Sequence, residues 1–347
     1  MTLSFYLCKF IGLRIVTAWI ALSLLGISLD LFRAATDIIE LGGALRLIEY
    51  IALRTPQIMV TLFPIATLLG ATTAFLSLGN NLEVIILRAS GSSFFIILRK
   101  LLPLTILLGL FYSQAGDRIN SWTSENLALS FPETKEKAPV GSTIWARDGN
   151  NIIKATLANE DGTRLDDLAI YEADEKGHVK ARVNAERADF ENGKWLFSNA
   201  LKISPFSTQE EQPQVWSTLL TPENVRKIAS NTVDVSAKDA RAALAGSSVA
   251  TRSTSYYTTR IARTYSAIFL PFVLCMIAAL AGFGGTRNDS GLRLAIYAVV
   301  IGFLYVVFDG MFGSLGESGV LPAYVAALTP TALFAIGSLW GLIIVDG

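Results

Sequence analysis

One acidic and one basic side chain share a short apolar segment, and they are the first candidates for functional chemistry. The segment runs from Gly79 to Gly91 and contains Glu83 and Arg88. Its apolar side chains recur at the spacing of one helix face: Leu82, Ile85, Ile86 and Ala89. A short helix that presents a carboxylate and a guanidinium is suited to docking a partner protein. A plain helix at a membrane interface explains the same pattern.

The rest of the sequence contains no arrangement that favours covalent catalysis or metal binding. The single histidine, His178, follows Gly177 in a turn and has no cysteine or histidine nearby to complete a metal site. Cys8 and Cys275 lie in or beside apolar runs, and we interpret both as packing residues. There is no G-x-x-x-x-G-K-S/T motif to cradle a nucleotide. We therefore expect a protein that is not an enzyme, binds no cofactor or metal, and takes its energy from a partner or an ion gradient.

The distribution of charge defines the elements that must position these residues. A polar block, about Asp117 to Arg260, contains 18 of the 29 Lys and Arg and 20 of the 29 Asp and Glu. Outside it lie long uncharged runs, among them Thr55–Leu82 and Ser318–Val345. Because a bilayer span needs about 20 apolar residues, these runs predict membrane helices on both sides of a water-exposed insert. The formal net charge of +0 gives no basic field that would favour nucleic acid.

Three spans are predicted on each side of the insert: Gly12–Leu31, Gln57–Leu78, Phe94–Ala115, Thr264–Gly284, Leu294–Gly313 and Ser318–Val345. The short loops carry seven Lys or Arg on one side and three on the other. This bias predicts cytoplasmic termini and an insert outside, in the periplasm of a bacterium. Asp309 is the single candidate for an intramembrane charge, and a carboxylate at a helix end, at the membrane interface, is the favoured explanation. Transport driven by an ion gradient is therefore poorly supported.

The insert is predicted to be an antiparallel β-jellyroll or sandwich, which makes the fold class an α+β membrane protein. Between His178 and Phe190, apolar and polar residues alternate as in half-buried strands. The apolar set is Val179, Ala181, Val183 and Ala185. Turn signals recur at short spacing, including Asp148–Asn151 and Glu191–Gly193. The flanks, Ile119–Leu129 and Ser236–Leu244, are predicted to be helices that link the sheet to the membrane.

Five segments, taken in order along the chain, carry a resemblance to a known family: Phe63–Gly70, Asn81–Gly91, Trp145–Asn151, Phe303–Gly313 and Ser338–Trp340. They resemble parts of the LptF/LptG permease family of the lipopolysaccharide exporter, and the LptG branch more closely. The second of them, NLEVIILRASG, is similar to the coupling-helix motif of that family. The third, WARDGNN, is similar to the start of its periplasmic domain. The resemblance covers essentially the whole chain.

The resemblance implies a permease subunit of an ABC-type exporter. In that family an LptF-like and an LptG-like permease clasp an LptB-like ATPase dimer, which binds the ATP. Lipopolysaccharide leaves the inner membrane through a lateral gate of spans one and five and enters the periplasmic jellyroll. It then passes to LptC-like and LptA-like bridge proteins. The implied location is the inner membrane of a Gram-negative bacterium.

The resemblance also implies roles for individual residues. Glu83 and Arg88 match the positions that engage the ATPase. Arg33 matches a basic position near the phosphates of the lipid, which a guanidinium binds in bidentate fashion. A snorkelling residue at the end of span one explains Arg33 as well. Just downstream, residues 38–40 are Ile, Ile and Glu in place of a Lys-richer stretch, so a wider phosphate-binding cluster is not expected.

Span five adds a candidate for contact with acyl chains. Leu304, Phe308 and Phe312 are four residues apart and form a stripe on one helix face. Ordinary packing between helices explains this stripe equally well.

The predicted domains are 1–116, with a coupling helix at about 80–91; 117–260, the jellyroll with its helical linkers; and 261–347, with spans four to six. Two other function classes stay open. One is a membrane-anchored periplasmic sensor, and the other is a mechanotransmitting ABC subunit that drives a periplasmic partner without moving lipid. The helix around Glu83 favours an ATPase partner over a sensor, because a sensor usually carries a cytoplasmic output domain and none is apparent.

Overall fold

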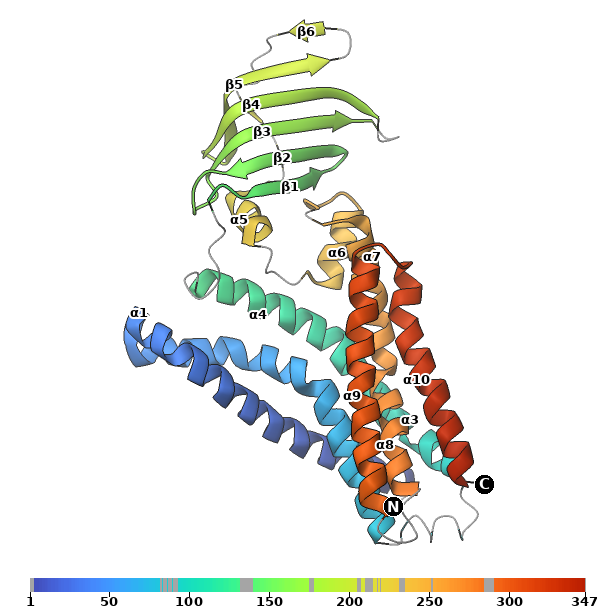
Figure 1. The fold of residues 1–347 in the computed structure, drawn as a ribbon. Helices are drawn as coiled ribbons and strands as arrows, with labels where there is room; N and C mark the ends of the chain where they lie inside the picture. Colours follow the sequence, from blue (N-terminus) through green and yellow to red (C-terminus); the bar gives the residue numbers. More distant parts are fainter. Residues whose placement is uncertain are drawn as a thin grey trace. The chain divides into compact units, whose positions relative to one another are not determined.

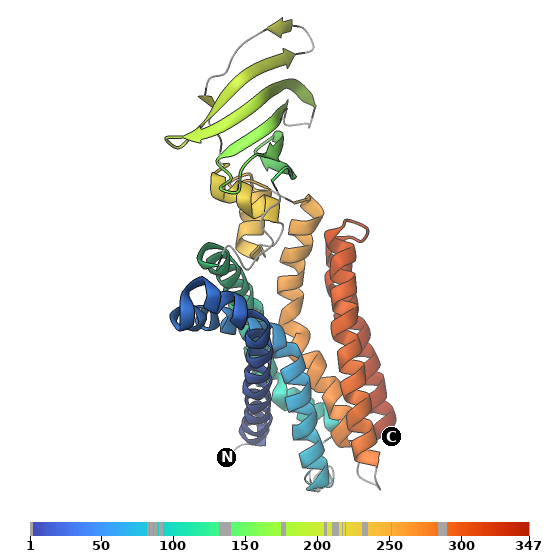
Figure 2. The same cartoon turned by 60° about the vertical axis from the view of Figure 1, so that its left-hand side comes forward.

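The computed structural model divides the chain into two compact units (Figures 1 and 2). The first consists of Met1–Thr123 and Thr258–Gly347, and the second of Ser124–Tyr257. The structure describes residues 3–81, 83, 86, 89, 93–131, 140–174, 178–204, 207–209, 215–216, 218, 220–230, 235–250, 252–283 and 290–346.

Within the described ranges, the first unit contains six helices that are long and apolar enough to cross a membrane: Leu3–Thr36, Gly43–Asn80, Phe95–Ser124, Thr254–Gly282, Arg293–Glu317 and Ala323–Ile344. They confirm the six predicted spans. The first two belong to one element, α1 (Leu3–Asn80), which doubles back on itself between them (Figure 1). Gly43 has a φ of 72° there, a conformation that glycine adopts without strain.

The remaining helical elements of this unit follow in chain order: α3 (Phe94–Leu110), the π-helix η1 (Phe111–Ala115), α4 (Gly116–Ser130), α7 (Thr254–Ser266), the 3₁₀-helix η3 (Ala267–Phe269), α8 (Leu270–Phe283), α9 (Ser290–Glu317) and α10 (Ala323–Asp346). Several predicted boundaries are wrong. Span one begins nine residues before the predicted Gly12, and span two begins fourteen residues before the predicted Gln57. Span four begins ten residues before the predicted Thr264, and span six does not begin at Ser318. Gly319, with a φ of 80°, follows the end of α9, and α10 begins only at Ala323. The loop was missed because it contains no charged residue.

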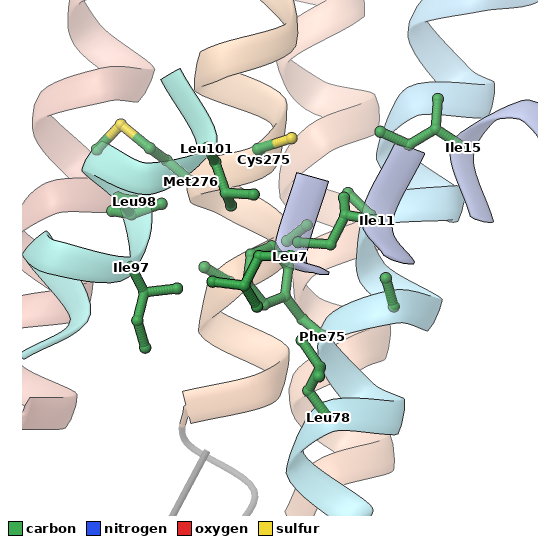
Figure 3. Close-up of a cluster of buried hydrophobic side chains, with 14 of the residues drawn as sticks. Leu7, Ile11, Ile15, Phe75, Leu78, Ile97, Leu98, Leu101, Cys275 and Met276 are labelled. Carbon is green, nitrogen blue, oxygen red and sulfur yellow. The ribbon is translucent and has the colours of Figure 1, made fainter. Parts of the chain in front are cut away.

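Spans two and four form the centre of the helical unit. In their most apolar windows 61% and 67% of the residues are buried, against 17% to 28% in the other four spans. Glycines allow the backbones of neighbouring spans to approach closely. A Cβ on Gly70 of span two would lie 2.4 Å from Ile15 Cα of span one, and a Cβ on Gly282 of span four would lie 2.6 Å from the Phe75 carbonyl oxygen of span two. Such small-residue contacts hold helices together in lipid. Figure 3 shows the apolar cluster in which spans one to four meet.

The second unit is built on one curved antiparallel sheet (Figure 1). Its described strands are β1 (Thr143–Asp148), β2 (Asn151–Leu157), β3 (Arg164–Ala173), β4 (Val179–Glu191), β5 (Lys194–Ser204), β6 (Ser207–Gln209) and β7 (Val215–Trp216). β1 to β6 follow one another in sequence order across the sheet, and β7 pairs with β5. The predicted turns at Asp148–Asn151 and Glu191–Gly193 are confirmed, and each is a β-hairpin with a two-residue loop. In the second, Asn192 and Gly193 both have positive φ, as a type I′ turn requires.

One face of the sheet forms the core of this unit. Ala181, Val183 and Ala185 are buried as predicted, whereas Val179, at the start of β4, is 52% exposed because the strand begins there at the edge of the packed region. The predicted helical flanks are confirmed in α4 and in α6 (Ala237–Leu244). The fold class is therefore an α+β membrane protein with an antiparallel sheet inserted between spans three and four.

Candidate functional site

Glu83 lies just after span two, and a tyrosine of span one binds its carboxylate. Glu83, Ile86 and Ala89 have helical backbone, in line with the predicted coupling helix. The Tyr6 Oη donates a hydrogen bond to Glu83 Oε2 over 2.9 Å, across 77 positions of sequence. Ile86, three residues after Glu83, is an apolar residue that is 66% exposed. Arg88, the second predicted coupling residue, lies outside the described residues.

Arg33 is exposed near the far end of span one, next to a polar link between spans one and two. Tyr50 Oη donates to Asp30 Oδ2 over 2.9 Å, and Arg54 Nε donates to the same oxygen over 3.2 Å. Arg54 therefore neutralises the carboxylate nearest to Arg33 in the sequence. The Arg33 side chain itself is exposed. Its contact with lipid phosphate stays a prediction.

The predicted stripe on span five is partly engaged in helix packing. Leu304 is 44% exposed and Phe308 is 39% exposed. The ring of Phe308 lies 6.4 Å from that of Phe312 and 5.9 Å from that of Phe334 on α10. Packing against α10 thus accounts for part of the stripe, and its contact with acyl chains stays a prediction.

A more exposed row on α9 escaped the sequence analysis. Five apolar side chains that repeat along one helix face are each at least 40% exposed: Ile296, Val300, Phe303, Val307 and Met311. Span one has a comparable row of side chains that are each at least 50% exposed: Leu13, Ile20 and Leu24. Spans one and five each therefore present an apolar face that no other described helix of this chain covers. Such a face meets either lipid or a partner helix.

A charged cluster lies where spans three, four and five meet, and the sequence analysis found only one of its members. Arg263 Nη2 donates to Asp309 Oδ2 over 2.6 Å, and Arg263 Nη1 lies 3.8 Å from Glu317 Oε1. Arg260 Nε lies 3.8 Å from Asp117 Oδ1. The five side chains are between 12% and 28% exposed. Four of them, all but Glu317, border a cavity of about 120 Å³.

Two irregular helix turns meet beside this cluster. The π-helix η1 packs against the 3₁₀-helix η3, and Ser113 Oγ of η1 donates to the carbonyl of Thr264, in α7 just before η3, over 2.5 Å. A Cβ on Gly109, in α3 just before η1, would lie 2.0 Å from the carbonyl oxygen of Ile268 in η3, so the backbones of α3 and η3 are in direct contact. A π-helix in a long helix is frequently a functional feature. The cluster and the two turns together fix span four against spans three and five.

Two residues of these sites were missed for different reasons. Arg263 lies between the end of the polar block at Arg260 and the predicted start of span four at Thr264, so it was assigned to neither. The i,i+3 spacing of Arg260 and Arg263 was the available signal for a charged face at the end of that span. No local sequence pattern pointed to Tyr6, because its partner Glu83 is far away in the sequence.

Metal and cofactor binding receive no support from the described part of the chain. Within it, no group of three His, Cys, Asp or Glu is arranged to hold a metal ion. His178 is exposed and its Nδ1 lies 3.5 Å from Asp174 Oδ2, an ordinary surface contact in the turn before β4.

Comparison with known proteins gives a match over nearly the whole chain. The family model for "Lipopolysaccharide export system permease LptF/LptG" matches residues 5–344. The lipopolysaccharide export system permease protein LptG of Haemophilus influenzae is 24% identical over 312 residues, which cover 84% of each chain. The protein of the same name from Escherichia coli K12 is 24% identical over 309 residues, which cover 84% of this chain and 83% of that protein.

Proposed function

Because the chain belongs to the LptF/LptG family of lipopolysaccharide export permeases, we propose that it is the LptG-like subunit of an ABC-type exporter. In this proposal it lies in a Gram-negative inner membrane, with both termini in the cytoplasm and the sheet unit in the periplasm. It pairs with an LptF-like permease and extracts lipopolysaccharide. An LptB-like ATPase dimer binds and hydrolyses the ATP, and LptC-like and LptA-like proteins receive the lipid.

The apolar faces of spans one and five are the observation that carries this proposal. Each face is long and continuous, whereas spans two and four are largely buried within the chain. A lateral gate requires helices that are held on one side and meet a separable neighbour on the other. We therefore place the gate between span one of each permease and span five of its partner. Arg33, near the outer part of span one, is then placed to contact the phosphates of a passing lipid.

Glu83 supports the proposed contact with the ATPase. Its carboxylate is held by Tyr6, and Ile86, three residues further on, has an exposed apolar side chain. An ion pair surrounded by apolar contact is a common way to anchor a docking helix. By the family resemblance, Arg88 completes the site.

The test of the proposal is purification of the chain in mild detergent, followed by identification of the proteins that remain bound. We expect a soluble ATPase and a second six-span permease. Reconstitution of that complex with lipopolysaccharide and a periplasmic acceptor should then show lipid release that depends on ATP. Recovery of the chain alone, or release without ATP, contradicts the proposal.

A substitution makes the test specific for the ATPase contact. Glu83→Ala is expected to reduce ATPase retention on the column about tenfold, as expected for the loss of a charge-assisted contact. Glu49→Ala is a matched control, because Glu49 is an exposed carboxylate near the start of span two that pairs with Arg46 on the same helix. Equal retention of the ATPase by both variants contradicts a role for Glu83.

One observation favours a second function, that of a mechanotransmitting subunit. The apolar face of the sheet is covered by α5 (Pro222–Ser230): Val225 of this helix is fully buried, and Trp195 Nε1 donates to the carbonyl of Leu220 over 2.8 Å. A lipid that enters this face must first displace α5. Photo-crosslinkers at Val183 and Leu168, two buried sheet positions, separate the two functions. Crosslinking to lipopolysaccharide during ATP hydrolysis supports passage through the sheet, and its absence while the complex releases lipid supports mechanotransmission.

A further inference from the structure

Tyr6 connects span one to Glu83, which lies just after span two. Its hydroxyl donates to Glu83 Oε2 over 2.9 Å. A carboxylate has room for several hydrogen bonds at once. Glu83 is therefore able to keep the bond to Tyr6 while it binds a cation of a docked protein. In that arrangement Tyr6 orients the carboxylate and connects it to span one.

The contact continues along one face of span one. Tyr6, Phe10 and Arg14 are four residues apart, so they lie above one another on the helix. The rings of Tyr6 and Phe10 stack with centroids 6.0 Å apart, and the Arg14 guanidinium lies 5.2 Å from the centroid of the Phe10 ring. Arg14 Nη2 donates to Ser77 Oγ on span two over 3.4 Å. We call Tyr6, Phe10 and Arg14 the Tyr6 ladder.

Another face of span one is firmly packed into the bundle. Leu7, Ile11 and Ile15 are 0% to 1% exposed, and Ile15 lies against Gly70 of span two. Close-packed contacts of this kind transmit a displacement and do not absorb it. A shift of the Glu83 segment therefore moves this part of span one together with the ladder.

We propose that Tyr6 is a positioning residue that couples the Glu83 segment to span one, so that partner movements at Glu83 reach the gate helix through the Tyr6 ladder. The proposal rests on the proposed function, because it takes Glu83 as the docking point of the ATPase. It assigns Tyr6 a role in the use of ATP energy and none in ATPase binding.

The experiment uses the full complex in proteoliposomes and compares wild type with Tyr6→Phe. Phenylalanine keeps the stacking on Phe10 and removes only the hydroxyl. We expect ATPase retention and ATP hydrolysis at wild-type levels, and about threefold less lipopolysaccharide released per ATP, in line with the loss of one exposed hydrogen bond. Tyr324→Phe is the matched control: Tyr324 is 73% exposed on α10, and the substitution should leave release per ATP unchanged.

A second variant tests the ladder itself. Phe10→Leu interrupts the stack while the hydroxyl of Tyr6 stays in place, and it should also lower release per ATP. Both changes interrupt the same path. The double variant should therefore release as much lipopolysaccharide per ATP as the more impaired of the two single variants, and no less. Unchanged release per ATP in Tyr6→Phe, or a fall in ATPase retention equal to that of Glu83→Ala, overturns the proposal. A wild-type complex that releases no lipid contradicts the proposed function itself, so that the two failures are distinguishable.

Discussion

The ion pair between Arg263 and Asp309 allows a quantitative test of how span five is held. The two side chains are 28% and 25% exposed, and their nitrogen and oxygen lie 2.6 Å apart. Breaking a buried pair costs about 3–5 kcal/mol, and an exposed pair is worth about 0–1 kcal/mol. Partial exposure places Asp309→Asn between these limits, at about 2 kcal/mol of unfolding free energy. At about 1.4 kcal/mol for each factor of ten, this loss is about 30-fold in the unfolding equilibrium.

Arg263→Gln should cost more than Asp309→Asn. It leaves Asp309 without its cation and also removes the neighbour of Glu317, 3.8 Å away. We expect about 3 kcal/mol for this variant, the lower limit for an uncompensated buried charge. In the double variant the loss should fall about 1–2 kcal/mol short of the sum of the single losses, because the pair is broken only once.

The assay is reversible unfolding of the four proteins in mixed micelles of dodecyl maltoside and sodium dodecyl sulfate. Arg118→Gln serves as the control, since Arg118 is exposed on α4 and its loss should change the free energy by less than about 0.5 kcal/mol. The two single variants each lose unfolding free energy. If these losses add up to the loss in the double variant, to within about 0.3 kcal/mol, the two side chains do not stabilise span five as a pair.

Two further predictions concern single contacts. Gly109→Ala should lower the unfolding free energy by about 1–3 kcal/mol in the same micelle assay, because the added Cβ would lie 2.0 Å from the Ile268 carbonyl oxygen. Gly337→Ala, with nothing within 4 Å, should be neutral or stabilising, and equal losses in both variants contradict the packing argument. Ser236→Ala should cost about 1 kcal/mol, because its Oγ accepts from the Asp239 amide at the start of α6. Faster amide exchange in residues 237–244 would show this loss, and unchanged exchange would contradict it.

Charge and local periodicity were sufficient to predict most of the architecture. Uncharged runs located the six spans, because a helix in lipid tolerates few charges. The hairpins at Asp148–Asn151 and Glu191–Gly193 were predictable, because such turns need residues that accept positive φ. The errors lay at the ends of elements. Span four extends back to Thr254 in polar sequence, and this extension kept Arg263 out of the list of membrane residues.

The candidate site was less predictable than the fold. Glu83 was predicted from its local segment, whereas its partner Tyr6 comes from a different span and leaves no periodic signal. The apolar stripe at Leu304 and Phe308 followed from spacing alone, and spacing does not distinguish a face that meets lipid from one that packs on Phe334. Pairing and exposure depend on how distant helices assemble, and a single sequence does not encode that assembly in any local pattern.

The way the outer spans are attached bears on the lateral gate that we propose. Helices in lipid gain no hydrophobic energy from meeting one another, so packing and a few polar contacts hold them together. Spans one and five each keep an apolar face free. Span one joins the bundle through its packed residues Leu7, Ile11 and Ile15 and through polar contacts of Tyr6 and Arg14. Span five joins it through Ala298 and Tyr305 and through the ion pair of Asp309. The polar contacts are worth about 1–3 kcal/mol each, which is small beside the free energy of ATP hydrolysis. A helix attached in this way is able to move without unfolding the buried pair of spans two and four, and a lateral gate requires that property.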